Sequence, residues 1–274
     1  MRWTALVFCF AIACGGGGSD PAPQVDRTPV EQPDVVLLTV SGRNLDLLDF
    51  FCPPECNEAY LGEAGDAGEA VFTELTNRGL TVEVENYIAA WDNFEGPLRF
   101  GARQLIRDLE EIYETWVKDQ AEPTRIVILA HSHGAVWAHN VIAALPDIPI
   151  DILVSIDGVT TQWESDHADS LTDWFNANGN PFAFDLRDVS DAWLVNSVAR
   201  DTKDVAFDTI GVNIEVQSND FLIFDDVDNL RIDGSETGIR RLFASGDDHG
   251  EVHEPGTEAM NFVIDEIVLA LFGP

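Results

Sequence analysis

The sequence predicts an α/β fold in which a mostly parallel sheet carries helices on both faces. Short runs of β-branched and other apolar residues alternate along the chain with longer segments whose apolar residues recur every three or four positions. This alternation is typical of parallel sheets, because each pair of parallel strands needs a crossover that packs on one face. The apolar fraction of 45% is sufficient for a core of ordinary size, and no internal repeat is present.

The predicted strands are short, mostly apolar runs bounded by turn residues. The run at 35–40 reads VVLLTV, and the run at 150–156 is similarly rich in isoleucine and valine. Strands of this kind are buried on both faces, as in a parallel sheet covered by helices. In chain order the predicted strands are residues 35–40, 81–87, 125–129, 150–156, 193–198, 212–217, 221–224 and 242–244.

The predicted helices show apolar residues on one face. Residues 101–118 give the clearest pattern, with apolar positions three and four apart and charges between them. Gly79 stops the helix expected at 66–78. The remaining helices are predicted at residues 132–145 and 257–272. Between them the regular rhythm breaks at 158–190, where five aromatic residues stand among polar ones: Trp163, Trp174, Phe175, Phe182 and Phe184.

The charge balance limits the possible partners. The chain has 49 acidic against 15 basic residues, a formal net charge of −34. Such a surface repels nucleic acid and anionic lipid head groups, so we expect neither as an electrostatic partner. The acidic run at 225–228, followed by Asp233 and Gly234, lacks the ligand spacing of a calcium loop. We expect a solvated acidic hairpin there and no metal.

The N-terminus indicates export. Arg2 precedes a short apolar stretch that is too short to span a bilayer and that ends Ala-Ile-Ala-Cys at Cys14. This ending resembles the lipobox of bacterial lipoproteins, although leucine is usual where Ala11 stands. The resemblance implies a signal peptide at 1–13, a diacylated Cys14 and a membrane-anchored location in the bacterial cell envelope. A plain signal peptide cut nearby is the alternative.

The anchor would be joined to a single domain. Residues 14–33 are rich in glycine, serine and proline and predict a lipidated flexible tether, followed by one domain at 34–274. Cys52 and Cys56 stand in the sequence CPPEC. In an exported, oxidising context they favour a local disulfide. A two-cysteine metal site is set aside because Cys9 would leave with the signal peptide and Cys14 would be lipidated, so no further cysteine remains to complete it.

The stretch at 124–144 carries the main functional motif. An apolar run stops abruptly at the sequence AHSHG, and a helical pattern begins directly behind it. A β-branched strand, a small-X-Ser-X-small turn and a helix predict a nucleophile elbow with Ser132 at its tip. Ala130 and Gly134 are small at the two positions where larger side chains would collide. The alternative is an ordinary strand–turn–helix with a serine N-cap.

A nucleophilic serine needs a histidine as its base and an acid that orients the histidine. His249 follows the last predicted strand and precedes the terminal helix, so we expect it to be the base, with His253 as the alternative. Asp157 ends the strand after the elbow helix among apolar residues and glycine. We expect it to be the acid, because a desolvated carboxylate needs a partner. Asp201, among charged residues, is the alternative.

The elbow AHSHG after a hydrophobic strand, with Ser-Ile-Asp-Gly one strand later, resembles the α/β-hydrolase family, in particular its lipase-like members. The likeness covers about 35–272, and Ala130 stands where the family commonly has glycine. The resemblance implies hydrolysis of a small-molecule or lipid carboxylic ester with no metal and no organic cofactor. It also implies an oxyanion hole made by the backbone N–H of His133 and of Gly42 or Arg43.

We therefore expect an exported, lipid-anchored serine hydrolase that is a monomer. In this reading the aromatic segment at 158–190 is a lid or an acyl-binding wall over Ser132. A small satellite core under a long loop is the alternative for that segment. The competing function is a catalytically inactive envelope lipoprotein that keeps the hydrolase scaffold for binding.

Overall fold

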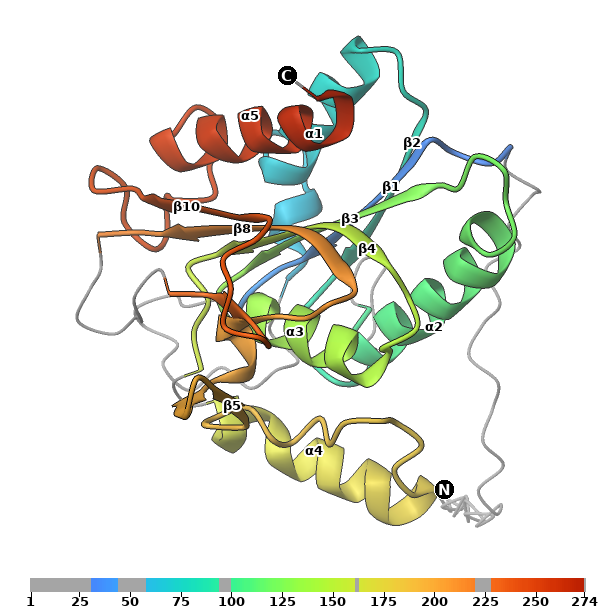
Figure 1. Ribbon diagram of the computed structural model, residues 1–274, viewed down its shortest axis with the longest axis vertical. Coiled ribbons are helices and arrows are strands. Elements are labelled where there is room, and N and C mark those ends of the chain that lie inside the picture. Colours follow the sequence, from blue (N-terminus) through green and yellow to red (C-terminus); the bar gives the residue numbers. More distant parts are fainter. Residues whose placement is uncertain (1–30, 44–57, 94–99, 161–162, 220–227, 274) are drawn as a thin grey trace, which may run out of the picture. The chain divides into compact units, whose positions relative to one another are not determined.

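The computed structural model describes residues 31–43, 58–93, 100–160, 163–219 and 228–273. The chain divides into two compact units, Met1–Glu31 and Gln32–Pro274, and the architecture below belongs to the second. Its centre is a six-stranded sheet in which every neighbouring pair is parallel (Figure 1). The structure therefore confirms the predicted α/β class with a parallel sheet between helices.

The strands of this sheet are ordered β10-β8-β4-β3-β1-β2. The strand β3 lies between β1 and β4, so the residues that follow these three strands meet at one edge of the sheet. The strands are β1 (Val35–Val40), β2 (Val82–Tyr87), β3 (Arg125–His131), β4 (Ile150–Ile156), β8 (Ile210–Gln217) and β10 (Ile239–Phe243).

Helices cover both faces of the sheet. The helices α1 (Ala67–Asn77) and α5 (Glu258–Phe272) lie on one face, and α2 (Ala102–Ile112) and α3 (His133–Ala144) lie on the other (Figure 1). Successive strand side chains point to opposite faces, so Leu37 packs with α1 and α5 whereas Leu38 packs with α2 and α3. Burying each such aliphatic side chain stabilises the fold by about 1.5–3 kcal/mol. Packing on both faces therefore holds the strands, and the residues at their ends, in place.

The aromatic segment at 158–190 contains a helix that the sequence did not predict. This helix, α4 (Trp163–Asn178), lies below α3 in the view of Figure 1. Trp163 and Phe175 are buried in the core on the α3 side, and Trp174, Phe182 and Phe184 pack against it. The buried face of α4 includes a polar residue, His167. Because this residue interrupts the apolar residues at helical spacing, the sequence pattern does not indicate a helix.

The strand predicted at 193–198 is wrong. The structure forms an antiparallel hairpin instead, β5 (Trp193–Val195) and β6 (Val198–Arg200), outside the central sheet. The hairpin turns at Asn196 and Ser197, whose φ angles are 52° and 66°. Two adjacent residues in the left-handed region are typical of a tight hairpin turn, and neither is glycine, the usual indication of such a turn.

Several short elements complete the fold. They are η2 (Tyr60–Gly62), the π-helical end of α2 named η3 (Tyr113–Val117), η4 (Thr202–Asp204), β7 (Val205–Ala206) and β9 (Leu230–Arg231). In the described part of the chain no helix is both long and apolar enough to cross a membrane. Other predictions fall outside the described residues: the signal peptide at 1–13, Cys14, the pair Cys52 and Cys56, and the strand at 221–224.

Candidate active site

Three of the predicted site residues lie at the carboxyl edge of the sheet. Ser132 directly follows β3 and Asp157 directly follows the neighbouring strand β4. His249 lies on the loop of residues 244–257, between β10 and α5. The parallel sheet therefore brings together three residues that are far apart in the sequence.

Ser132 sits on a strained turn between β3 and α3. Its φ and ψ are 56° and −130°, a conformation that costs a non-glycine residue about 1–3 kcal/mol. Its N–H donates to the carbonyl oxygen of Ile156 at 3.0 Å, which ties the turn to β4. A Cβ at Gly134 would lie 2.1 Å from the carbonyl oxygen of Val40, so glycine is required there. This is the geometry expected of a nucleophile elbow.

The three side chains form a continuous hydrogen-bonded line. Nε2 of His249 lies 3.1 Å from Oγ of Ser132, and Nδ1 of His249 lies 2.6 Å from Oδ2 of Asp157. The Asp157 side chain is fully buried and that of His249 is 12% exposed. Because the ionised carboxylate only accepts, Nδ1 carries the proton and Nε2 accepts from the serine hydroxyl.

The carboxylate of Asp157 is held by a residue that the sequence did not indicate. Ser218, the first residue after β8, donates from its N–H to Oδ1 at 2.9 Å and from its hydroxyl to Oδ2 at 2.5 Å. The N–H of Asp157 in turn donates to Val216 at 2.7 Å. The role of Ser218 follows from the pairing of β8 with β4, and no local motif around Ser218 signals that pairing.

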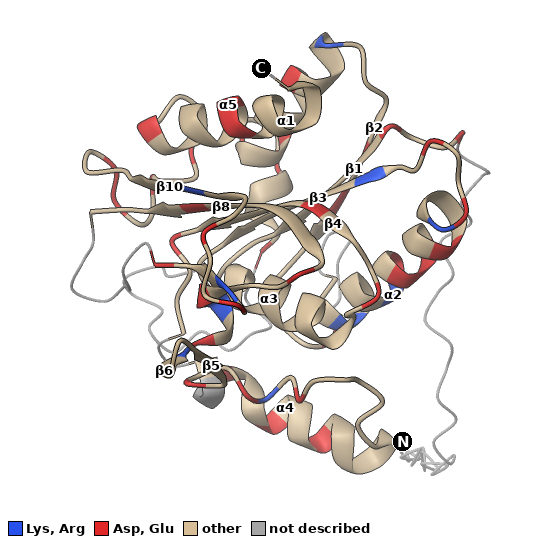
Figure 2. Ribbon diagram, viewed as in Figure 1, with Lys and Arg blue, Asp and Glu red and all other residues tan. Residues whose placement is uncertain are grey.

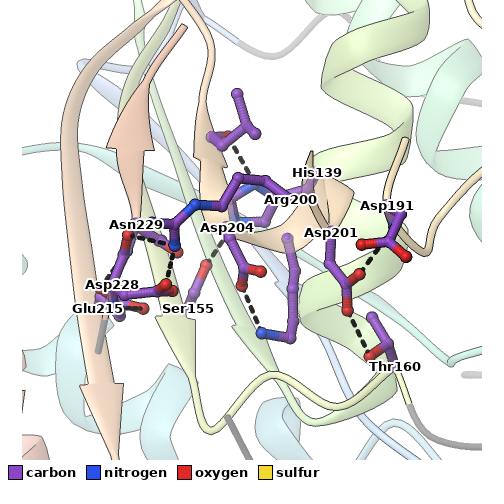
Figure 3. A network of polar contacts seen from close by, with 12 residues as sticks. His139, Ser155, Thr160, Asp191, Arg200, Asp201, Asp204, Glu215, Asp228 and Asn229 are labelled. Atoms are coloured by element: carbon purple, nitrogen blue, oxygen red, sulfur yellow. Dashed lines mark hydrogen bonds and ion pairs between the residues drawn. The ribbon is translucent and has the colours of Figure 1, made fainter. Parts of the chain in front are cut away.

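Asp201, the alternative acid, lies elsewhere (Figure 3). Its carboxylate accepts from the Thr160 hydroxyl at 2.8 Å and from the N–H of Asp191 at 3.0 Å. These bonds hold together the loops that flank α4. Asp201 therefore connects loops, whereas Asp157 is the carboxylate that is hydrogen-bonded to His249.

His253, the alternative base, packs behind the site. Its ring centroid lies 4.7 Å from that of His131 and 4.9 Å from that of Tyr60. Burial lowers the pKa of His253 below its usual range, and His249 lowers it further. The imidazole that accepts the hydrogen bond from the Ser132 hydroxyl is that of His249.

The turn after β1 lies against the nucleophile, as expected for one wall of an oxyanion hole. A Cβ at Gly42 would lie 2.4 Å from Cβ of Ser132, so this close approach requires glycine. The N–H of Gly42, however, donates to the Tyr60 hydroxyl at 2.8 Å, which corrects the expectation that it points at the substrate. Arg43 is the other predicted donor from this turn. His133 is the first residue of α3, where the helix dipole favours negative charge.

The paired strands β4 and β8 carry buried, hydrogen-bonded polar side chains (Figure 3). Glu215 of β8 accepts from the backbone N–H groups of Asp228 and Asn229 at 3.2 and 3.1 Å, and burial raises its pKa to about 7. On the paired strand β4, Ser155 is bonded to Nε2 of His139 at 2.8 Å. Burial lowers the pKa of His139 to about 3, so this histidine is neutral.

Among the residues that the structure describes, no three or more His, Cys, Asp or Glu side chains are grouped so that they could hold a metal ion. Part of the acidic run at 225–228 falls outside these residues. The expectation of a solvated acidic hairpin therefore stays a prediction.

Comparison with known proteins gives no family assignment. No family model matches the sequence, and no curated protein matches it. Solved structures with some likeness include the ydeN gene product of B. subtilis, at 11% identity over 86% of this chain and 98% of that chain, with a TM-score of 0.43. Another is the esterase domain of a Rhodothermus marinus protein, at 12% identity over 89% of each chain, with a TM-score of 0.42. A third is Est1E from Butyrivibrio proteoclasticus, at 13% identity over 87% and 90%, with a TM-score of 0.39. The function is therefore argued from the site itself.

Proposed function

We propose that this protein is a serine hydrolase of the α/β-hydrolase type that cleaves carboxylic esters through an acyl-enzyme. The observation that carries the proposal is the line of hydrogen bonds from Ser132 through His249 to the buried Asp157. The ordinary alternative, a serine N-cap, is not favoured, because the Ser132 side chain makes no capping hydrogen bond to α3. Its hydroxyl lies against the imidazole instead.

In the proposed mechanism Oγ of Ser132 attacks the ester carbonyl while Nε2 of His249 takes the hydroxyl proton. Asp157 stabilises the imidazolium that forms and keeps Nδ1 protonated. The tetrahedral intermediate collapses, the alkoxide leaves, and His249 gives it the proton. A water then attacks the acyl-serine with His249 as base, releasing the acid and restoring Ser132.

The developing negative charge on the carbonyl oxygen would lie at the amino end of α3. We assign one donor to the backbone N–H of His133, the residue after the nucleophile, where the helix dipole adds to the hydrogen bond. For the second donor we now favour Arg43 over Gly42. The support is the bond from the Gly42 N–H to Tyr60, which directs that group away from a substrate.

We propose that the helix α4 borders the substrate site at the residue after Ser132. On α4, Asp166 pairs with Nη1 of Arg43 at 2.6 Å and lies 3.9 Å from Nδ1 of His133. The His167 ring lies 5.7 Å from the His133 ring and 5.1 Å from that of Trp163. The α4 side chains that reach the residue after Ser132 are thus Asp166 and His167. Trp163 and Phe175 are buried in the core on the α3 side, so the aromatic residues fit a satellite core better than an acyl-binding wall.

Export, a lipid anchor at Cys14, a disulfide between Cys52 and Cys56, and a monomeric state complete the proposal. Export, the anchor and the disulfide rest on the N-terminal sequence and on the spacing of the cysteines, and the monomeric state is proposed without a sequence feature of its own. An anchored enzyme would stay close to lipid esters.

The test is hydrolysis of p-nitrophenyl esters of increasing acyl length by the purified domain at 34–274. Replacing Asp157 with Asn leaves His249 without its anionic partner and should lower kcat by about 10⁴-fold. Asp201→Asn is the matched control, because it removes an equivalent charge from the alternative acid, and it should keep kcat within a few-fold. Circular dichroism would verify that both variants fold.

Two results would contradict the proposal. One is the absence of turnover of every ester by the wild-type protein, which would favour the inactive lipoprotein. The other is a larger loss of kcat in Asp201→Asn than in Asp157→Asn, which would mean that the hydrogen-bonded line is not the catalytic one.

A further inference from the structure

The mechanism above leaves one buried group beside the nucleophile without a role. His131, the last residue of β3, immediately precedes Ser132 and is only 3% exposed. Its Nδ1 lies 2.5 Å from the hydroxyl of Tyr60, and its Nε2 lies 3.1 Å from the backbone carbonyl oxygen of His249. His131 therefore contacts the backbone of the proposed base.

The chemistry of the partners fixes the direction of each hydrogen bond. A carbonyl oxygen only accepts, so Nε2 of His131 carries the proton and donates to His249. Nδ1 is then the acceptor, and the Tyr60 hydroxyl donates to it. The same hydroxyl accepts from the N–H of Gly42 at 2.8 Å. A directed chain of three hydrogen bonds thus joins the turn after β1 to the loop at 244–257.

Ring packing adds to these bonds. The centroid of the His131 ring lies 4.7 Å from that of His249 at an interplanar angle of 32°, and 4.7 Å from that of His253. Tyr60 meets the His131 ring edge-on at 5.8 Å. The imidazole of His249 therefore packs against the ring of His131, while its two nitrogens are hydrogen-bonded to Ser132 and Asp157.

The side chains of Tyr60 and His131 are both neutral at ordinary pH. Burial lowers the pKa of His131 well below its usual range, and the neighbouring His249 and His253 lower it further. Burial also raises the pKa of Tyr60. A neutral ring can stay stacked on His249 when that imidazole becomes charged, whereas a charged neighbour would oppose the proton transfer.

We propose that Tyr60 and His131 are positioning residues, which hold the loop at 244–257 so that Nε2 of His249 stays within reach of Ser132. This inference rests on the proposed function, because positioning matters only if His249 acts as the base. A displacement of about 1 Å in a catalytic group can lower the rate by about a hundredfold.

The test uses the purified full chain, four single variants and the double variant Tyr60→Phe/His131→Leu. Tyr60→Phe removes the donated proton, and His131→Leu removes both bonds of the imidazole at similar volume. His131→Gln keeps an N–H that can reach the His249 carbonyl. His139→Leu is the matched control, because His139 is an equally buried histidine whose bonds go to Ser155 and Val205 instead.

We expect Tyr60→Phe and His131→Leu to lower kcat for a p-nitrophenyl ester by about 10- to 100-fold, with KM changed by less than about threefold. His131→Gln should recover most of the loss. The double variant should be no slower than His131→Leu alone, because both residues act through one chain. His139→Leu should lower the melting temperature and leave kcat nearly unchanged.

Amide hydrogen exchange provides a readout that does not depend on turnover. In Tyr60→Phe and His131→Leu, the peptides covering 244–257 should exchange faster than in the wild type and in His139→Leu. If the wild type cleaves no ester, the proposed function fails, while the exchange data still test whether the chain holds this loop.

Three outcomes would overturn the inference. The first is unchanged kcat and unchanged exchange in His131→Leu. The second is additive losses in the double variant. The third is a loss near 10³-fold in Tyr60→Phe with none in His131→Leu, which is the size expected if the hydroxyl itself stabilised the oxyanion.

Discussion

Ser132 is the residue at which backbone strain and the proposed chemistry coincide. Its positive φ points the hydroxyl toward His249, and the turn is held by a bond from its N–H to the neighbouring strand. Strain of about 1–3 kcal/mol persists only where surrounding packing enforces it. Here the enforcement comes from two glycines, Gly134 and Gly42, which allow backbone and side chain to approach the turn closely.

Gly134 lies where the elbow leaves no room for a side chain. A Cβ there would lie 2.1 Å from the carbonyl oxygen of Val40 and 2.8 Å from that of Ser41, so Gly134→Ala must displace backbone. Overpacking of this kind costs about 1–3 kcal/mol, which lowers the melting temperature of a domain of this size by about 3–10 °C. Calorimetry would measure the shift.

The control for that substitution is Gly246→Ala. A Cβ at Gly246 has nothing within 4 Å, so this variant should melt within about 2 °C of the wild type. Equal melting temperatures for Gly134→Ala and Gly246→Ala would contradict the account of the elbow.

The sequence predicted those site residues that stand close together in one short motif. Ser132 and Gly134 stand in one pentapeptide, so their spacing alone indicated the elbow. Ser218 and Tyr60 could not be found in that way. The contact of Ser218 with Asp157 arises from strand pairing, and that of Tyr60 with Gly42 from the placement of the short helix η2 at the sheet edge.

Most secondary-structure elements could be predicted because their apolar periods are clear. Strands β1 and β4 have the predicted bounds, and α5 begins one residue after the expected start. The helix α4 and the hairpin of β5 and β6 were missed. In α4 a polar residue, His167, lies on the buried face and interrupts the apolar pattern. In the hairpin, Asn196 and Ser197 form the turn, where glycine would have been the usual indication.

The strand β8 carries a buried carboxylate, Glu215, whose ionisation should make the stability of the fold depend on pH. Burial raises the pKa of Glu215 to about 7 from its ordinary value of 4.5, opposed by hydrogen bonding from Asn229 and by Arg241. Between pH 4.5 and 7 the folded protein therefore binds a proton that the unfolded chain has lost. The free energy of unfolding should fall as pH rises across this window, by on the order of 3 kcal/mol from this group.

The measurement compares the wild type with Glu215→Gln in urea unfolding at several pH values from 4.5 to 7.5. The variant should gain stability relative to the wild type as pH rises, whatever its stability at pH 4.5. Glu122→Gln, which changes an exposed carboxylate, should keep a constant difference from the wild type. A constant difference for Glu215→Gln would contradict the stated cause.

At the scale of the whole molecule, the parallel sheet is what assembles the site. Ser132 and His249 are separated by 117 positions in the chain, and Asp157 and His249 by 92. They meet because the strands that precede them end at the same edge. From the sequence, Asp157 was favoured by its apolar surroundings and His249 by its place after the last strand, but their hydrogen bond depends on a strand order that no local pattern indicates.

The charge of −34 is also a property of the whole molecule. Asp and Glu are spread over the helices and loops, and Lys and Arg are few (Figure 2). The expectation that polyanions are not partners follows from this excess and stays a prediction. The lipid anchor at Cys14 and the disulfide of Cys52 with Cys56 also stay predictions.

The central claim is that the folded chain turns Ser132 into a nucleophile with His249 as its base. The most direct measurement is labelling of the purified domain at 34–274 with a fluorophosphonate, followed by mass spectrometry of the peptides. We predict a single adduct on Ser132 that is absent in urea and in Ser132→Ala. His249→Ala should slow labelling by about 10²–10⁴-fold, while His253→Gln should slow it far less. Failure of the folded wild-type protein to form the adduct, or equal labelling of the folded and unfolded chains, would contradict the claim.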